Sequence, residues 1–106
     1  MGGMSDEAKL PDGWSPCSGP EGFVEELNRE LVKGHPLFGR KLTVLAVRQD
    51  RDDALFRAAS GEMFVVHLTW IQKPERLPWP IVVWESARHD FDEFKAWSAE
   101  FYDHAR

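Results

Sequence analysis

The sequence contains a single cysteine, Cys17, so the chain can form no internal disulfide and cannot supply a zinc cluster from cysteines alone. It also has no apolar run that approaches the roughly 20 residues needed to cross a bilayer, and its amino terminus lacks the hydrophobic region of a secretory signal. Basic residues are the minority, with 13 Lys and Arg against 18 Asp and Glu and a net charge of −5. Because nucleic-acid affinity comes largely from Lys and Arg at phosphates, this balance argues against a nucleic-acid partner. We expect a cytoplasmic protein with neither a membrane nor a nucleic acid as its partner.

The familiar catalytic and cofactor motifs are also missing. The sequence has no P-loop, dinucleotide-binding fingerprint or serine nucleophile elbow. Neither the HExxH spacing of zinc enzymes nor the calcium-binding EF-hand pattern occurs. We therefore expect no cofactor and no dedicated metal site.

Aromatic residues, by contrast, are abundant, with five Trp and seven Phe among 106 residues. Each large ring can bury about 150–250 Å², so we expect one domain whose core is built around these rings. The longest run of β-branched, aromatic and aliphatic residues is 62–70, and its alternation predicts a central strand covered on both sides. One face of that strand would carry Phe64, Val66, Leu68 and Trp70, and the other Met63, Val65, His67 and Thr69.

Residues 1–19 show neither helical nor strand periodicity, so we expect a flexible arm followed by a single domain over 20–106. Trp14 stands out in the arm because a large ring in a tail can dock onto the body. Docking and a solvated tail both remain open. A helix is predicted over 20–33, with a proline in its first turn and a glycine just after its end. Its apolar stripe would be Phe23, Val24, Leu27 and Leu31, and its solvated side Glu25, Glu26, Arg29 and Lys33.

A second helix is predicted to follow Asp90, which resembles a capping box with Glu93 and precedes a broad aromatic stripe over 91–105. Strands are predicted over 41–48 and 81–84. The second of these would be an edge strand, because the proline before it has no N–H to donate to a neighbouring strand.

Residues 54–59 are predicted to form a hairpin with the central strand. The pair 60–61, Ser-Gly, is a plausible two-residue turn in which glycine supplies the positive φ. This turn would set Phe56 opposite Val65. Leu55 would then share the face of Val66, and Ala54 would lie beside His67.

The predicted fold is α+β, a single domain in which a four-stranded antiparallel meander packs with an N-terminal and a C-terminal helix in the order α-β-β-β-β-α. Both helical stripes need a sheet face to cover, and the face of Phe64 is the natural candidate. The other face would then be an open apolar patch of the kind that marks interaction surfaces. Two alternatives compete: the arm with Trp14 covers that face, or the helices lie on opposite faces. The predicted binding surface consists of Phe56, Met63, Val65 and His67, with Trp79 and Trp84 near the sheet edge.

Several short segments carry a resemblance to a known family. They are Gly34-His35-Pro36-Leu37-Phe38-Gly39, Asp52-Asp53-Ala54-Leu55-Phe56, Val66-His67-Leu68-Thr69-Trp70, Glu75 and Pro78-Trp79-Pro80. Together they resemble a family of short bacterial proteins that has no assigned activity, over roughly Leu27 to Trp84. The resemblance implies a compact bacterial domain. It brings no catalytic residue and no cofactor to carry over.

Four side chains are candidates for catalysis. His67 lies between apolar neighbours, where a histidine bonded to a backbone group or a carboxylate is the commoner arrangement. The alternative makes it a general base or metal ligand, assisted by Asp52 or Asp53 near the hairpin. His35 lies between a helix-ending glycine and a proline, so we expect it to shape the turn. The acidic loop 50–53 is more typical of a solvated loop than of a cation site.

Two functions of different classes follow from these features. We favour a small non-enzymatic protein-binding or regulatory module of the bacterial cytoplasm, which binds a protein partner or a second copy of itself through the second sheet face. Its acidic charge would suit a basic protein partner. The alternative is a small hydrolase or metal-dependent enzyme that uses His67 with Asp52 and Asp53, and with His35 as a further candidate.

Overall fold

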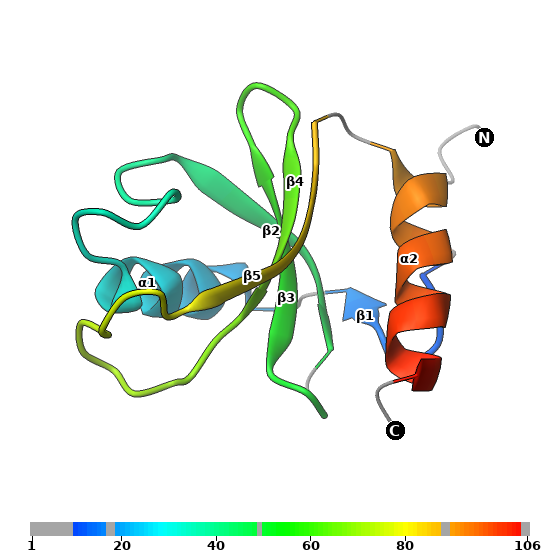
Figure 1. The fold of residues 1–106 in the computed structure, drawn as a ribbon, viewed down its shortest axis with the longest axis horizontal. Helices are drawn as coiled ribbons and strands as arrows, with labels where there is room; N and C mark the ends of the chain where they lie inside the picture. The colour runs from blue at the N-terminus through cyan, green and yellow to red at the C-terminus, as the bar shows by residue number, and fades with distance from the viewer. Residues whose placement is uncertain (1–9, 17–18, 49, 88–89, 105–106) are drawn as a thin grey trace.

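The computed structural model describes residues 10–16, 19–48, 50–87 and 90–104, which form two helices and a five-stranded antiparallel sheet (Figure 1). The strands follow one another in space in chain order, so the predicted α+β meander is confirmed, with one strand more than predicted. The helices are α1 (Pro20–Glu30) and α2 (Phe91–His104). The strands are β1 (Ser15–Pro16), β2 (Leu42–Arg48), β3 (Asp53–Ala58), β4 (Met63–His67) and β5 (Ile81–Ser86).

The additional strand, β1, lies in the segment predicted to be a flexible arm, and it pairs antiparallel with β2. Trp14, directly before β1, is only 6% exposed, and its indole Nε1 donates a hydrogen bond to Ser98 Oγ on α2, 2.9 Å away. Of the two alternatives left open for Trp14, the structure therefore shows docking. β1 could not be predicted because two residues, one of them proline, show no alternation. Residues 1–9 and 17–18 of the predicted arm lie outside the described residues.

The first helix begins at Pro20, as predicted, but ends at Glu30. Leu31 leaves the helix with extended backbone angles (φ −74°, ψ 137°). This exit buries the Leu31 side chain in the same core cluster as Leu27 of α1. The predicted solvated side of the helix is wrong at Glu26, whose exposed fraction is 0%.

The turn between β3 and β4 has three residues rather than the predicted two. The N–H of Ala58 donates to the carbonyl of Glu62, and the N–H of Gly61 to the carbonyl of Ala58, each over 2.9 Å. Gly61 takes a φ of 104°, a conformation that glycine adopts without steric penalty. The extra residue moves the hairpin by one position, and a one-residue slip exchanges the two faces of a strand. The predicted register is therefore wrong. The observed pairs are Phe56–Phe64, Leu55–Val65, Ala54–Val66 and Asp53–His67.

The central strand is confirmed as an interior strand, because β4 lies between β3 and β5, and β5 lies at the edge of the sheet as predicted. β4 is shorter than predicted, however, and ends at His67. The N–H of Leu68 bonds the carbonyl of Asp52 over 2.9 Å, and Trp70 has a φ of 55°, which is incompatible with a strand.

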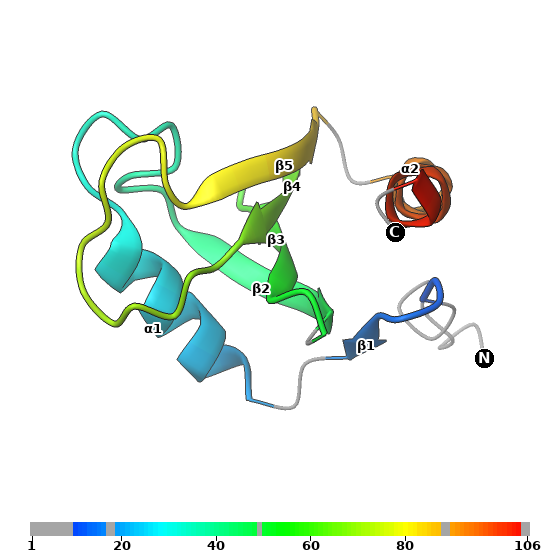
Figure 2. The same ribbon diagram turned by 60° about the horizontal axis from the view of Figure 1, so that its bottom comes forward.

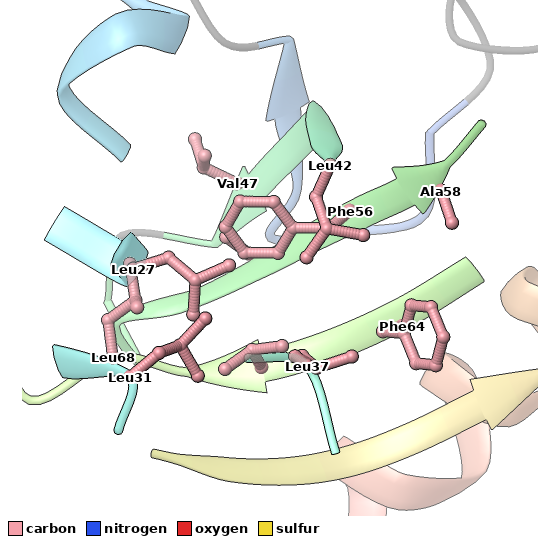
Figure 3. Close-up of a cluster of buried hydrophobic side chains, with 11 residues drawn as sticks. Leu27, Leu31, Leu37, Leu42, Val47, Phe56, Ala58, Phe64 and Leu68 are labelled. Carbon is pink, nitrogen blue, oxygen red and sulfur yellow. The ribbon is translucent and has the colours of Figure 1, made fainter. Parts of the chain in front are cut away.

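The two helices lie on opposite faces of the sheet (Figure 2), so the expectation that both cover one face is wrong. On the α1 face, Phe56, Phe64 and Leu68 pack with Leu27 and Leu31 (Figure 3). Full burial of such a side chain stabilises the fold by about 1.5–3 kcal/mol. The other face is covered by α2 and by the arm. Its buried cluster contains Trp14, Ala46, Leu55, Met63, Val65, Phe91, Phe94 and Tyr102.

Candidate functional site

The first candidate site is a cluster of three side chains, Asp53, His67 and Tyr102, from three different elements. The observed register sets Asp53 on β3 opposite His67 on β4, and Asp53 Oδ1 lies 2.8 Å from His67 Nδ1. The Tyr102 hydroxyl on α2 donates to Asp53 Oδ2 over 2.5 Å. Asp53 is buried, so its carboxylate bridges the sheet and the C-terminal helix. Sequence reasoning named the aspartate and the histidine but missed the tyrosine, because no local pattern shows which side chain α2 brings to that point.

Burial and the adjacent carboxylate of Asp53 raise the pKa of Tyr102 well above its ordinary value. The hydroxyl therefore stays protonated and donates. The Arg48 guanidinium lies over the Tyr102 ring, 4.1 Å from its centroid. Because a carboxylate only accepts hydrogen bonds, Nδ1 of His67 carries the proton of this contact. The His67 side chain is 40% exposed, and its Nε2 bonds no other described residue. Chemically, that nitrogen can accept a proton or a hydrogen bond.

The other two catalytic candidates do not join this cluster. Asp52 is exposed, has a φ of 58°, and contributes its backbone carbonyl to the end of the hairpin. His35 is buried: its Nδ1 accepts from the N–H of Leu37 at 3.1 Å, and its Nε2 donates to the carbonyl of Pro80 at 2.6 Å. The prediction that His35 shapes its turn is confirmed. Across the described part of the chain, no group of three or more His, Cys, Asp or Glu side chains could hold a metal ion.

The second candidate site is an exposed apolar surface. Most of the large exposed apolar side chains lie in two loops that Figures 1 and 2 place at the same end of the molecule. Four of them belong to the connection between β4 and β5, residues 68–80, which we call the β4–β5 loop. They are Trp70 (36% exposed), Ile71 (41%), Leu77 (50%) and Trp79 (41%), and Phe38 (46%) lies in the neighbouring loop.

A pocket of about 550 Å³ lies elsewhere, between α1 and β2, but a pocket of about 340 Å³ adjoins the exposed residues. It separates the turn after α1 from the β4–β5 loop. Leu77 forms part of its wall and approaches Gly34 so closely that a Cβ there would lie 2.9 Å from Leu77 Cδ1. The lining residues are Gly34, His35, Pro36, Leu77, Pro78, Ile81 and Val82.

Two fully buried glutamates of α1 hold the start of the β4–β5 loop. Glu30 Oε1 accepts from the N–H of Thr69 at 3.2 Å, and Glu30 Oε2 from the N–H of Trp70 at 2.9 Å. Glu26 Oε2 accepts from the N–H of Gln72 at 3.0 Å. Trp70 and Gln72 have positive φ values of 55° and 64°, which residues with a Cβ rarely adopt. Sequence reasoning missed this site. The sequence held a weak signal of it, because Glu26 and Glu30 are like charges at positions i and i+4, a pair that destabilises an isolated helix.

Burial, and secondly a side-chain hydrogen bond to Glu26, raises the pKa of Glu30 from 4.5 to about 7. The loop amides of Thr69 and Trp70 act in the opposite direction, because they stabilise the ionised carboxylate. At neutral pH the pair therefore carries less than its full charge of two.

The predicted binding surface changes accordingly. Phe56, Met63 and Val65 have exposed fractions of 0%, so none of them lies on the surface of this fold, and the expectation of an open second face is wrong. Trp84 is half-buried and stacks on Trp97 of α2, with 5.5 Å between ring centroids. Trp79 is exposed, and its ring centroid lies 6.5 Å from that of His67.

Comparison of the chain with protein-family models, curated proteins and solved structures finds no match in any of the three. The resemblance to short bacterial proteins therefore stays a prediction. Among the described residues, no helix is both long and apolar enough to span a membrane.

Proposed function

We propose that this protein is a non-enzymatic protein-binding module and that the β4–β5 loop is its contact surface. The observation that carries the proposal is the gathering of four large exposed apolar side chains, two of them tryptophan, in one loop. Single exposed apolar residues are common on soluble proteins, but contiguous apolar patches mark interaction sites. Tryptophan is also among the residues that most often dominate binding energy at protein interfaces.

The β4–β5 loop is preorganised: its shape is fixed by contacts within the protein in the absence of a partner. Its start is bonded to Glu26 and Glu30, and its end, at Pro80, to the buried ring of His35. The ring of Trp70 also packs edge-on against Phe23 of α1, 5.2 Å between centroids. A surface that is ordered in advance loses less conformational entropy on binding, which favours affinity.

The expected partner is a basic protein that presents an aliphatic or aromatic side chain to the pocket beside Leu77. The apolar lining of that pocket calls for an apolar anchor. The net charge of −5 favours a basic partner through the long-range field of the whole molecule, which accelerates association at low salt.

Catalysis is the weaker alternative. Its support is the Asp53–His67 contact of 2.8 Å with Nε2 turned away from the aspartate. Asp52 is not bonded to that pair through its side chain, and His35 is engaged with Pro80. We therefore assign the Asp53 cluster to the attachment of α2 and not to chemistry.

The test compares three immobilised proteins: the wild type, a Leu77→Ala/Trp79→Ala double variant, and a Phe101→Ala control. Phe101 is an exposed aromatic residue of α2, outside the loop, with an exposed fraction of 38%. Proteins captured from an extract of the source organism are identified, purified and titrated by calorimetry. We expect a basic protein that binds the wild type and the control alike and binds the double variant at least about tenfold more weakly. Equal affinity for all three would contradict the proposal.

A further inference from the structure

We propose that Glu26 and Glu30 form a proton-sharing carboxyl pair that holds the β4–β5 loop in its contact shape, and that loss of the shared proton releases the loop as the pH rises from mildly acidic values toward neutrality. The inference rests on the proposed function only for its last consequence, weaker partner binding. The release of the loop can be measured on the protein alone.

The first step is the proximity of the two carboxyl groups: Glu26 and Glu30 lie one turn apart on α1, and both accept hydrogen bonds from amides of the same short segment, 69–72. An ionised carboxylate has acceptors only, so two carboxyl groups can bond to each other only while one of them carries a proton. Both residues have an exposed fraction of 0%, so solvent water does not screen the repulsion that two ionised carboxylates would feel here. The arrangement follows the general rule that adjacent buried carboxyls ionise one at a time.

The second step is the shortage of compensating positive charge. On α1 itself, Arg29 Nε lies 3.4 Å from Glu26 Oε1, and this arginine is about half exposed. In the loop packed against the pair, Lys73 and Arg76 are exposed, and the Glu75 carboxylate bonds the N–H of Arg76. β2, the strand that packs against α1, contributes the apolar residues Leu42, Val44 and Val47 to the shared cluster. A second negative charge on the pair would therefore be poorly neutralised.

The third step links the pair to the shape of the loop. Three successive attachments, at Thr69, Trp70 and Gln72, end on the two carboxyls. Two of these residues have the positive φ that the backbone avoids without such bonds. When repulsion forces one carboxyl out toward water, its amide partners lose their acceptor and the backbone can relax. The exposed tryptophan of the loop would then leave its position against Phe23.

The direction of the effect follows from linkage. Glu30 binds its proton more tightly in the closed loop, where its pKa is about 7, than in an open loop, where the carboxyl is solvated near its ordinary 4.5. Opening therefore releases a proton, and raising the pH favours opening by up to about tenfold per pH unit for one proton. Most of that change falls below pH 7, and little further change follows above it.

The experiment measures hydrogen exchange of the loop amides in the full chain between pH 5 and pH 8, corrected for the intrinsic exchange rate. Amides of β3 and β4 serve as the internal reference. We expect protection at Thr69, Trp70 and Gln72 to fall at least about tenfold across this range while the reference stays constant. If the protection of the loop amides in the wild type does not change with pH, the proposal is wrong. This conclusion needs no variant.

Two matched variants separate the pair from general effects of pH. Glu26→Gln keeps an oxygen for the Gln72 amide but removes the second acid, so the fall in protection should shift to lower pH. Glu25→Gln changes an exposed neighbour on the same helix and should retain the wild-type profile. If the pH dependence of protection in Glu26→Gln equals that of the wild type, the two carboxyl groups do not share a proton.

The binding readout then distinguishes the two proposals. If the loop opens with pH and the affinity of the identified partner does not change, the contact surface is wrong and the carboxyl pair stands. If the protection of the loop does not depend on pH, the proposal of a proton-sharing pair is wrong, irrespective of how partner affinity changes.

Discussion

Trp14 donates a hydrogen bond to Ser98 across 84 positions of the chain, over 2.9 Å, and this bond fastens the segment before α1 to the last helix. The indole ring also packs edge-on against Phe94, 5.0 Å between centroids. α2 covers its sheet face through ring contacts of this kind, so the arm completes the second core.

Replacing Trp14 by Ala should therefore destabilise the whole protein and not only the arm. Truncation of a buried Trp removes packing worth about 3–5 kcal/mol, and it also leaves Ser98 Oγ without its partner. Trp14→Phe keeps most of the ring and loses the donor, so we expect a loss of about 1–3 kcal/mol. Urea denaturation measures both values. A change below about 0.5 kcal/mol for Trp14→Ala would mean that the arm is not part of the cooperative unit.

Tyr102→Phe should weaken the attachment of α2 through Asp53. The substitution leaves a buried carboxylate oxygen without a donor, for which we expect a loss of about 1–3 kcal/mol or more. His67→Ala exposes the same carboxylate on its other side, and His67 is partly solvated, so its effect should be smaller. Comparing the two by denaturation also tests the structural role of the cluster, because a catalytic role predicts no such order of stabilities.

Sequence reasoning succeeded where local chemistry decides the outcome. The Asp90–Glu93 capping pattern is an example: the N–H of Glu93 bonds Asp90 Oδ1 over 3.1 Å at the start of α2. It failed where a single residue in a turn decides a long-range register: Ala59 joins Ser60 and Gly61 in the turn, and this extra position exchanged the faces of Phe56 and Leu55. The burial of Glu26 could not be predicted, because its partner amide at Gln72 is 46 positions away.

The free energy of unfolding should depend on pH through Glu30. Its folded-state pKa, about 7, lies above the ordinary 4.5, so its contribution to stability is fully present below pH 4.5 and is lost as the pH rises through about 7. Between pH 5 and pH 8, we expect the free energy of unfolding of Glu26→Gln to rise by about 1–2 kcal/mol relative to that of Glu25→Gln. The reason is that Glu26→Gln removes the repulsion that raises the pKa of Glu30 and so reduces the stability lost at high pH. Urea denaturation of both variants at the two pH values measures the difference. A pH-independent difference would contradict the assignment.

His35→Phe should uncouple the turn after α1 from the end of the β4–β5 loop. The phenyl ring fills the space of the imidazole but leaves both the carbonyl of Pro80 and the N–H of Leu37 unpaired in a buried site. We expect a loss of about 2–4 kcal/mol for two unsatisfied groups, measured by denaturation. An exposed substitution in the same turn, Phe38→Ala, is the matched control and should change stability by less than about 0.5 kcal/mol. Equal losses of stability for the two substitutions would show that any change in this turn destabilises the protein and that the hydrogen bonds of the histidine are not the cause.

The contact surface itself should be separable from the fold. Leu77 and Trp79 are half or nearly half exposed, so the Leu77→Ala/Trp79→Ala variant should unfold within about 1 kcal/mol of the wild type while losing partner affinity. A residue whose main role is packing would show the reverse, a large loss of stability with binding retained by the molecules that remain folded. Denaturation and calorimetry on the same preparations give both numbers. If stability and affinity fall together, the loop is a structural support, and the contact surface must be sought on another face.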